Sequence, residues 1–184
     1  MNQEVIIVDN LYDTAYHYHK GFFENECVID DETKGKISQI LGNKIEILEA
    51  SNEVLTEDKT TEVCCHLGCD WIAVIYLSLP LASFGELGLG FYSHIATGLE
   101  TFPTEEELKV YGINKDKLSE VFNSDLSLWK EYGSIPAKYN RMILFRGNRW
   151  HSYGKGYWGY SKYFYAIPED NYKKWLILVE FFHY

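Results

Sequence analysis

Residues 71–79 read WIAVIYLSL, and this stretch indicates the fold class more clearly than any other part of the sequence. Its one polar residue is Ser78, and a short, nearly continuous apolar run of this kind predicts a β-strand covered on both faces. Residues 5–8 (VIIV) and 139–145 (YNRMILF) predict two further strands. Aromatic residues make up 16% of the chain, and they suit half-buried sheet surfaces. The sequence therefore predicts a mainly β protein.

The remaining elements are shorter and are separated by polar turns. We expect strands at 45–55, 60–65, 90–95 and 175–182, and short helices at 11–21 and 35–41. Residues 101–130 form an acidic, partly helical insertion, in which Thr104 followed by Glu105–Glu107 predicts a capped helix start, and 115–122 predicts a second helix. Many strands and few helices indicate a single jelly-roll domain over residues 1–184.

The composition of the chain argues against several classes of function. The formal net charge is −10, which opposes binding to nucleic acid or to anionic membranes. No apolar run approaches the roughly 20 residues of a membrane span, and the N-terminus has no secretory signal pattern. Three of the four cysteines, Cys64, Cys65 and Cys69, crowd into six positions. That spacing favours reduced thiols, buried or bound to metal, in a cytoplasmic protein.

The segment before the main strand, residues 64–70 (CCHLGCD), holds the richest set of potential metal ligands. Residues i and i+2 of a strand share a face, so Cys64 and His66 can point into the same space. Asp70 has the same parity but lies too far along an extended chain, unless Gly68 permits a bend. Buried structural cysteines are the competing interpretation, because cysteine is among the most buried residue types.

Two later residues extend this candidate site. His151 follows the predicted strand at 139–145, and it becomes a plausible ligand only if that strand lies opposite His66. Lys173 or Lys174 stands at the start of the last predicted strand. A solvated charge beside an apolar strand is the ordinary interpretation of such a lysine.

The order of these segments resembles a largely uncharacterised family of small proteins related to the 2-oxoglutarate/iron(II) oxygenases. The matching pieces are 5–12 (VIIVDNLY), 70–77 (DWIAVIYL), 88–94 (GLGFYSH), 97–99 (TGL), 139–147 (YNRMILFRG) with His151, and the aromatic closing strand. The resemblance covers most of the chain. It implies a double-stranded β-helix in which iron is held by a His-x-Asp pair and a distal histidine, with open positions for 2-oxoglutarate and oxygen.

The chain departs from that pattern because it contains no His-x-Asp. If His66 is the first ligand, the acidic position is occupied by Gly68, as in the iron halogenases of this superfamily. If the motif is counted back from Trp71, Cys64 takes the histidine position and His66 the aspartate position. The second alignment needs no deletion and keeps the i, i+2 geometry, so we prefer it.

The resemblance implies an oxygenase-like enzyme, a hydroxylase or a halogenase, that uses iron(II) or another divalent metal with 2-oxoglutarate. The expected metal ligands are His66 and His151, with Cys64 or Asp70 as the third. The expected cosubstrate-binding residues are Lys174, Tyr76 and Tyr92. The substrate, a small molecule or a peptide, is not indicated. The alternative is a non-catalytic jelly roll that has lost its iron site and serves as a binding module.

Overall fold

The structure is a computed structural model, and it describes residues 5–13, 31–55, 62–77, 88–153 and 158–166. The strands are β1 (Val5–Asp9), β2 (Glu46–Leu55), β3 (Trp71–Tyr76), β4 (Gly88–His94), β5 (Trp129–Pro136), β6 (Arg141–Arg146), β7 (His151–Ser152) and β8 (Trp158–Ala166). The helices are α2 (Asp31–Leu41), α3 (Glu105–Tyr111) and α4 (Leu118–Val121), with 3-10 turns at Lys115–Lys117 and Leu126–Leu128.

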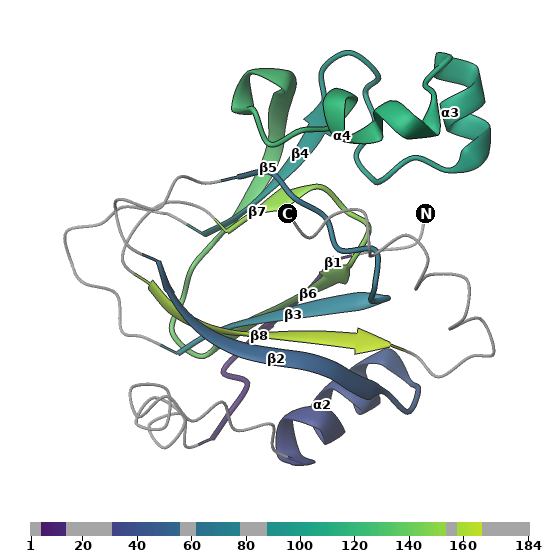
Figure 1. Ribbon diagram of the computed structural model, residues 1–184. Coiled ribbons are helices and arrows are strands. Elements are labelled where there is room, and N and C mark those ends of the chain that lie inside the picture. The colour runs from purple at the N-terminus through teal and green to yellow at the C-terminus, as the bar shows by residue number, and fades with distance from the viewer. Residues whose placement is uncertain (1–4, 14–30, 56–61, 78–87, 154–157, 167–184) are drawn as a thin grey trace.

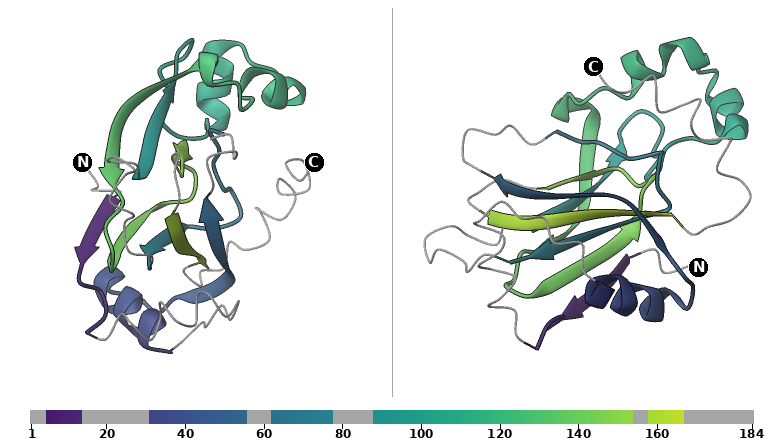
Figure 2. Two further views of the ribbon diagram at one scale, coloured as in Figure 1. Left: turned by 90° about the vertical axis from the view of Figure 1, so that its left-hand side faces the viewer. Right: turned by 60° about the horizontal axis from the view of Figure 1, so that its bottom comes forward.

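The described strands form two antiparallel sheets (Figure 1). The larger has the order β1-β6-β3-β8-β2, and the smaller has the order β5-β4-β7. Both views of Figure 2 show helix α2 on one side of the pair of sheets and helices α3 and α4 on the other. The expectation of a mainly β protein is confirmed.

Strand β3 lies between β6 and β8 in the larger sheet, and all six of its residues are buried. Its alternate side chains enter different layers of the core. Trp71, Ala73 and Ile75 pack with α2, while Ile72 and Val74 belong to the layer shared with the smaller sheet. This is why the sequence of β3 is apolar at every position, as expected of a strand with both faces covered.

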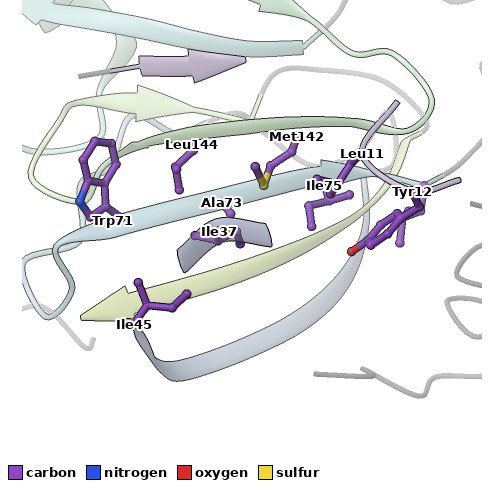
Figure 3. Close-up of a cluster of buried hydrophobic side chains, with 10 residues drawn as sticks. Leu11, Tyr12, Ile37, Ile45, Trp71, Ala73, Ile75, Met142 and Leu144 are labelled. Atoms are coloured by element: carbon purple, nitrogen blue, oxygen red, sulfur yellow. The ribbon is translucent and has the colours of Figure 1, made fainter. Parts of the chain in front are cut away.

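The outer layer lies between the larger sheet and α2 (Figure 3). Its fully buried side chains include Ile37 of α2, Ile75 of β3 and Met142 of β6. Burying an aliphatic side chain of this size contributes about 1.5–3 kcal/mol. This layer fixes the larger sheet from the side remote from the smaller sheet.

The inner layer lies between the two sheets. Phe145 of β6 meets Phe91 of β4 edge to face, with ring centroids 5.5 Å apart, and Leu89 of β4 is fully buried beside them. Because β4 also pairs with β7, this contact sets the distance between the larger sheet and His151.

A third cluster lies under the helices between β4 and β5. It contains Leu108 of α3, Leu118 of α4, Trp129 and Trp150. Helix α3 begins with the expected cap, because the Thr104 side chain accepts from the Glu107 backbone while the Glu107 side chain accepts from the Thr104 backbone. The second helix expected in this region is a short 3-10 turn followed by α4.

Some expected elements differ from the structure. Helix α2 begins at Asp31, four residues before the predicted helix at 35–41. Of the predicted strand at 60–65, the described part shows only a bridge at Cys64. Strand β8 is not among the strands expected from the sequence. Of the helix expected at 11–21, the first three residues are non-helical and the rest lies outside the described residues. The strand expected at 175–182 also lies outside them.

Within the described part of the chain, no helix is long and apolar enough to cross a membrane.

The buried His94 generates a prediction about pH. Its ring packs on Phe122 at 4.8 Å and on Trp129 at 5.2 Å. Burial lowers the pKa of His94 below its ordinary 6.5, and a hydrogen bond to the backbone of Val121 opposes this only partly. The unfolded chain therefore takes up the proton first, so the free energy of unfolding falls as the pH drops below that ordinary value.

We expect the Tm to decrease between about pH 7 and pH 5, and to decrease less in a His94→Gln variant. Thermal unfolding of both chains across this range measures the difference. An equal decrease in the two chains would show that other groups, and not His94, cause the pH dependence.

Candidate metal centre

His151 is held at the edge of the smaller sheet. It lies in β7 opposite Phe91 of β4, and on its other side it forms a bridge with Cys64. The backbone N–H of each bridge residue donates to the carbonyl of the other, at 2.9 Å in both directions. Directly paired residues on antiparallel strands project to the same face. Cys64 and His151 therefore meet although 87 positions separate them in the sequence.

The turn after Cys64 places His66. Its backbone N–H donates to the Gly147 carbonyl at 2.7 Å, and the Gly147 N–H donates to the Asp70 carbonyl at 3.1 Å. A Cβ atom at Gly147 would lie 2.4 Å from the carbonyl oxygen of Cys69 and 2.6 Å from that of His66. Only glycine allows the turn to lie so close to the end of β6.

Three ligand atoms converge at this point. The Cys64 Sγ lies 3.9 Å from the His66 Nε2 and 3.7 Å from the His151 Nε2. The two imidazole rings have centroids 5.4 Å apart. All three ligand atoms lie within 4.8 Å of one another, His151 is buried, and the other two residues are half-buried. Among the described residues, this is the group whose composition and spacing suit a metal ion.

The hydrogen bonds of His151 define its tautomer. Its Nδ1 lies 2.8 Å from the Arg149 carbonyl oxygen. A carbonyl can only accept, so Nδ1 carries the proton and Nε2 presents its lone pair to Cys64 and His66. A histidine that binds metal through one nitrogen is oriented in this way by a hydrogen bond from the other.

Tyr153 is the fourth group at this point. Its hydroxyl oxygen lies 3.1 Å from the His151 Nε2 and 3.4 Å from the His66 Nε2. Tyr153 is not among the site residues expected from the sequence. The one signal for it is its i, i+2 spacing from His151, which places both side chains on one face if the extended chain continues.

The three-ligand group includes none of the other expected site residues that the structure describes. Asp70 is not a member, and its backbone carbonyl accepts from the Gly147 N–H. Tyr76 lies in the inner layer, where burial raises the pKa of its hydroxyl above the ordinary range. Tyr92 packs against the third cluster, and its hydroxyl donates to Glu131 at 3.1 Å. Burial, with a smaller effect of Glu131, raises the pKa of Tyr92 to about 12. Lys174 lies outside the described residues.

The neighbouring thiols differ from Cys64. Burial, followed by the nearby Cys64 and Cys69, raises the pKa of the Cys65 thiol well above its usual value. Cys65 packs against the third cluster, and the Cys69 Sγ lies 3.8 Å from the His66 carbonyl oxygen. Cys64 is thus the cysteine whose sulfur faces the two imidazoles. One sulfur and two nitrogen donors form a set that suits zinc or iron(II).

Comparison with known proteins gives one family model. A family of unknown function, DUF6445, matches residues 67–154. The match spans less than half of the chain, begins one residue after His66, and includes His151 and Tyr153. No curated protein matches the chain.

Solved structures give a likeness of fold. HygX from Streptomyces hygroscopicus, solved with iron bound, has a TM-score of 0.53 at 10% identity, over 89% of this chain and 82% of HygX. The non-heme alpha ketoglutarate dependent carbocyclase SnoK, from nogalamycin biosynthesis, has a TM-score of 0.56 at 11% identity, over 89% and 79%. An N-substituted L-amino acid dioxygenase from Burkholderia ambifaria has a TM-score of 0.51 at 9% identity, over 91% and 84%. At such identities the likeness establishes a shared fold, in agreement with the jelly-roll expectation.

The close approach at Gly147 generates a prediction. In a Gly147→Ala variant the new methyl group would push the turn away from β6. His66 would move with the turn, away from Cys64. We expect a destabilisation of about 1–3 kcal/mol, typical of overpacking, together with weaker metal binding. Denaturant unfolding and zinc titration measure the two effects.

Gly133 provides the matched control, because a Cβ atom there would meet nothing within 4 Å. We expect Gly133→Ala to keep the metal affinity of the wild-type chain. If Gly147→Ala also bound zinc as the wild type does, the turn would not position His66.

Proposed function

We propose that this protein is a metal-dependent enzyme of the 2-oxoglutarate oxygenase type, built on a double-stranded β-helix, with Cys64, His66 and His151 as its metal ligands. The observation that carries the proposal is the convergence of these three donor atoms at the edge of the smaller sheet. These are the three ligands expected when the His-x-Asp motif is counted back from Trp71, so that Cys64 takes the histidine position and His66 the aspartate position.

The fold supports the proposal. HygX has also been solved with nickel and 2-oxoglutarate bound, at a TM-score of 0.52 to this chain, and SnoK is described as alpha ketoglutarate dependent. These descriptions apply to HygX and SnoK themselves. Because this chain brings metal-ligand residues together on a similar fold, iron(II) and 2-oxoglutarate are the first metal and cosubstrate to test here.

The donor set keeps the charge of the usual iron site. Two neutral imidazoles and one carboxylate hold iron(II) in the non-heme oxygenases and leave open positions. Here a thiolate would supply the single negative charge, since cysteine binds metal in its deprotonated form. The softer sulfur shifts preference toward zinc, yet the net charge donated to the ion is the same. The residues present therefore fit a divalent metal.

Each residue has a definite part in this proposal. The Arg149 carbonyl keeps the Nε2 of His151 unprotonated toward the ion, and Gly147 holds the turn that carries His66. When bound, iron(II) with 2-oxoglutarate would supply oxygen activation. We keep Lys174 as the proposed partner of the distal carboxylate of 2-oxoglutarate, and Tyr76 and Tyr92 as proposed cosubstrate-binding residues. Because Cys64 fills the third position, hydroxylation is favoured over halogenation, which needs that position vacant.

A second candidate is a non-catalytic jelly roll that retains a metal as part of its structure. The observation that favours it is the absence of a carboxylate from the Cys64, His66 and His151 group. Cysteine and histidine are the usual ligands of structural zinc.

One reconstitution experiment distinguishes the oxygenase-type enzyme from the non-catalytic jelly roll. Untagged protein, purified without chelator, is loaded anaerobically with iron(II), and succinate production from 2-oxoglutarate is measured. The proposed enzyme binds one iron per chain and forms succinate. Retention of one zinc, with no turnover of 2-oxoglutarate by the iron form, identifies the structural alternative.

Single variants test the ligand assignment. We expect Cys64→Ala, His66→Ala and His151→Ala each to weaken metal binding by more than the roughly 10–100-fold typical of losing an outer hydrogen-bond partner. Cys65→Ala is the matched control, because that thiol packs against the third cluster. Wild-type protein that retains neither iron nor zinc would contradict both candidate functions.

A further inference from the structure

We infer that Tyr153 is a fourth metal-binding residue, whose hydroxyl oxygen completes a four-coordinate site with Cys64, His66 and His151. The inference rests on the proposed metal centre and adds a regulatory consequence to it. A cosubstrate that binds the metal would have to displace Tyr153.

Four of the six distances among these donor atoms match those around a tetrahedral ion. With bonds of about 2.0–2.1 Å to nitrogen or oxygen and about 2.3 Å to sulfur, the edges of the tetrahedron are about 3.3 Å for nitrogen–oxygen and about 3.6 Å for nitrogen–sulfur. The Tyr153 oxygen lies 3.1 Å and 3.4 Å from the two imidazole Nε2 atoms. The Cys64 sulfur lies 3.7 Å and 3.9 Å from the same two atoms. Four of the six edges of the tetrahedron are thus within about 0.3 Å of those expected for zinc, and the His66 and His151 nitrogens lie within 4.8 Å of each other.

The chemistry of the four donors also suits one cation. The Nε2 of His151 presents its lone pair, because Nδ1 donates to the Arg149 carbonyl. The Cys64 sulfur and the Tyr153 oxygen can each bind a metal once deprotonated. One cation would therefore serve the oxygen, the sulfur and both nitrogens together.

The packing of Tyr153 directs its hydroxyl toward this point. Its ring meets the His151 ring edge to face, with centroids 5.0 Å apart and an interplanar angle of 85°. The ring also packs against the inner layer between the sheets, and the side chain is half-buried. The orientation of the oxygen is therefore set by the same contacts that hold His151.

A fourth protein ligand changes what the site can do. Structural zinc sites are closed by four protein ligands, whereas catalytic sites keep a position for water or substrate. Coordination by Tyr153 would replace its hydroxyl proton, released to solvent, with the metal. The resting centre would then be closed, and 2-oxoglutarate would open it by taking the position of the phenolate.

Resonance Raman spectroscopy of the iron form tests the inference. The full chain is loaded anaerobically with iron(II) and oxidised to iron(III) with ferricyanide, and spectra are recorded in the visible charge-transfer band. We expect enhanced tyrosinate ring modes, which ring-deuterated tyrosine shifts and which Tyr153→Phe abolishes. A thiolate ligand gives no such modes, so Cys64 cannot imitate the result.

Zinc affinity provides a second readout. We expect Tyr153→Phe to bind zinc at least tenfold more weakly, while the control Tyr132→Phe, at an exposed tyrosine of β5, binds as the wild type does. Saturating 2-oxoglutarate should remove the tyrosinate modes from the wild-type spectrum.

The outcomes separate the inference from the proposed function. Iron bound with a thiolate band, without tyrosinate modes and with unchanged zinc affinity in Tyr153→Phe, would overturn the inference and leave the metal centre intact. Failure of the wild-type chain to bind any metal would overturn both. Tyrosinate modes that persist under saturating 2-oxoglutarate would overturn the displacement step.

Discussion

The candidate centre depends on one pair of backbone hydrogen bonds, between Cys64 and His151. Each bond is 2.9 Å long, and together they attach the segment before β3 to the edge of the smaller sheet. Because the residues are directly opposed, their side chains must share a face. The i, i+2 relation then brings His66 and Tyr153 toward the same point from the two strands. Two hydrogen bonds and the alternation of an extended chain thus bring together all four candidate donors.

The cores on either side hold this pair in place. The larger sheet is fixed by α2 on its outer face and by the inner layer on the other. The Phe145 ring of that layer meets the His151 ring edge to face, with centroids 4.8 Å apart. On the opposite face, Trp150 is buried among the aromatic side chains beneath the helices. Trp150, just before β7, and His151, its first residue, are thus anchored in two separate clusters, which leaves His151 little freedom to move.

The sequence was sufficient for the parts that depend on local pattern. The apolar run of β3 predicted a doubly covered strand, and the parity of Cys64 and His66 predicted a shared face. It was insufficient where long-range pairing decides. Strand β8 pairs with β2 and β3, and its mixture of glycine, serine and aromatic residues has no clear alternation. Asp70 has the right parity, but its carbonyl is held by Gly147, a contact between residues 77 positions apart that no local pattern reveals.

The framework also explains how such a centre can change its ligands without losing its place. Positions 64, 66 and 151 are set by backbone pairing, so a cysteine can replace another ligand type while the three side chains still converge. The ligand types select the metal, and one thiolate with two neutral imidazoles suits a divalent ion. Whether that ion performs chemistry depends on the fourth corner, since an open position admits a cosubstrate and a filled one does not. That corner faces the Tyr153 oxygen, only 3.1 Å from the His151 Nε2. The choice between a structural and a catalytic centre therefore depends on how readily this side chain gives way.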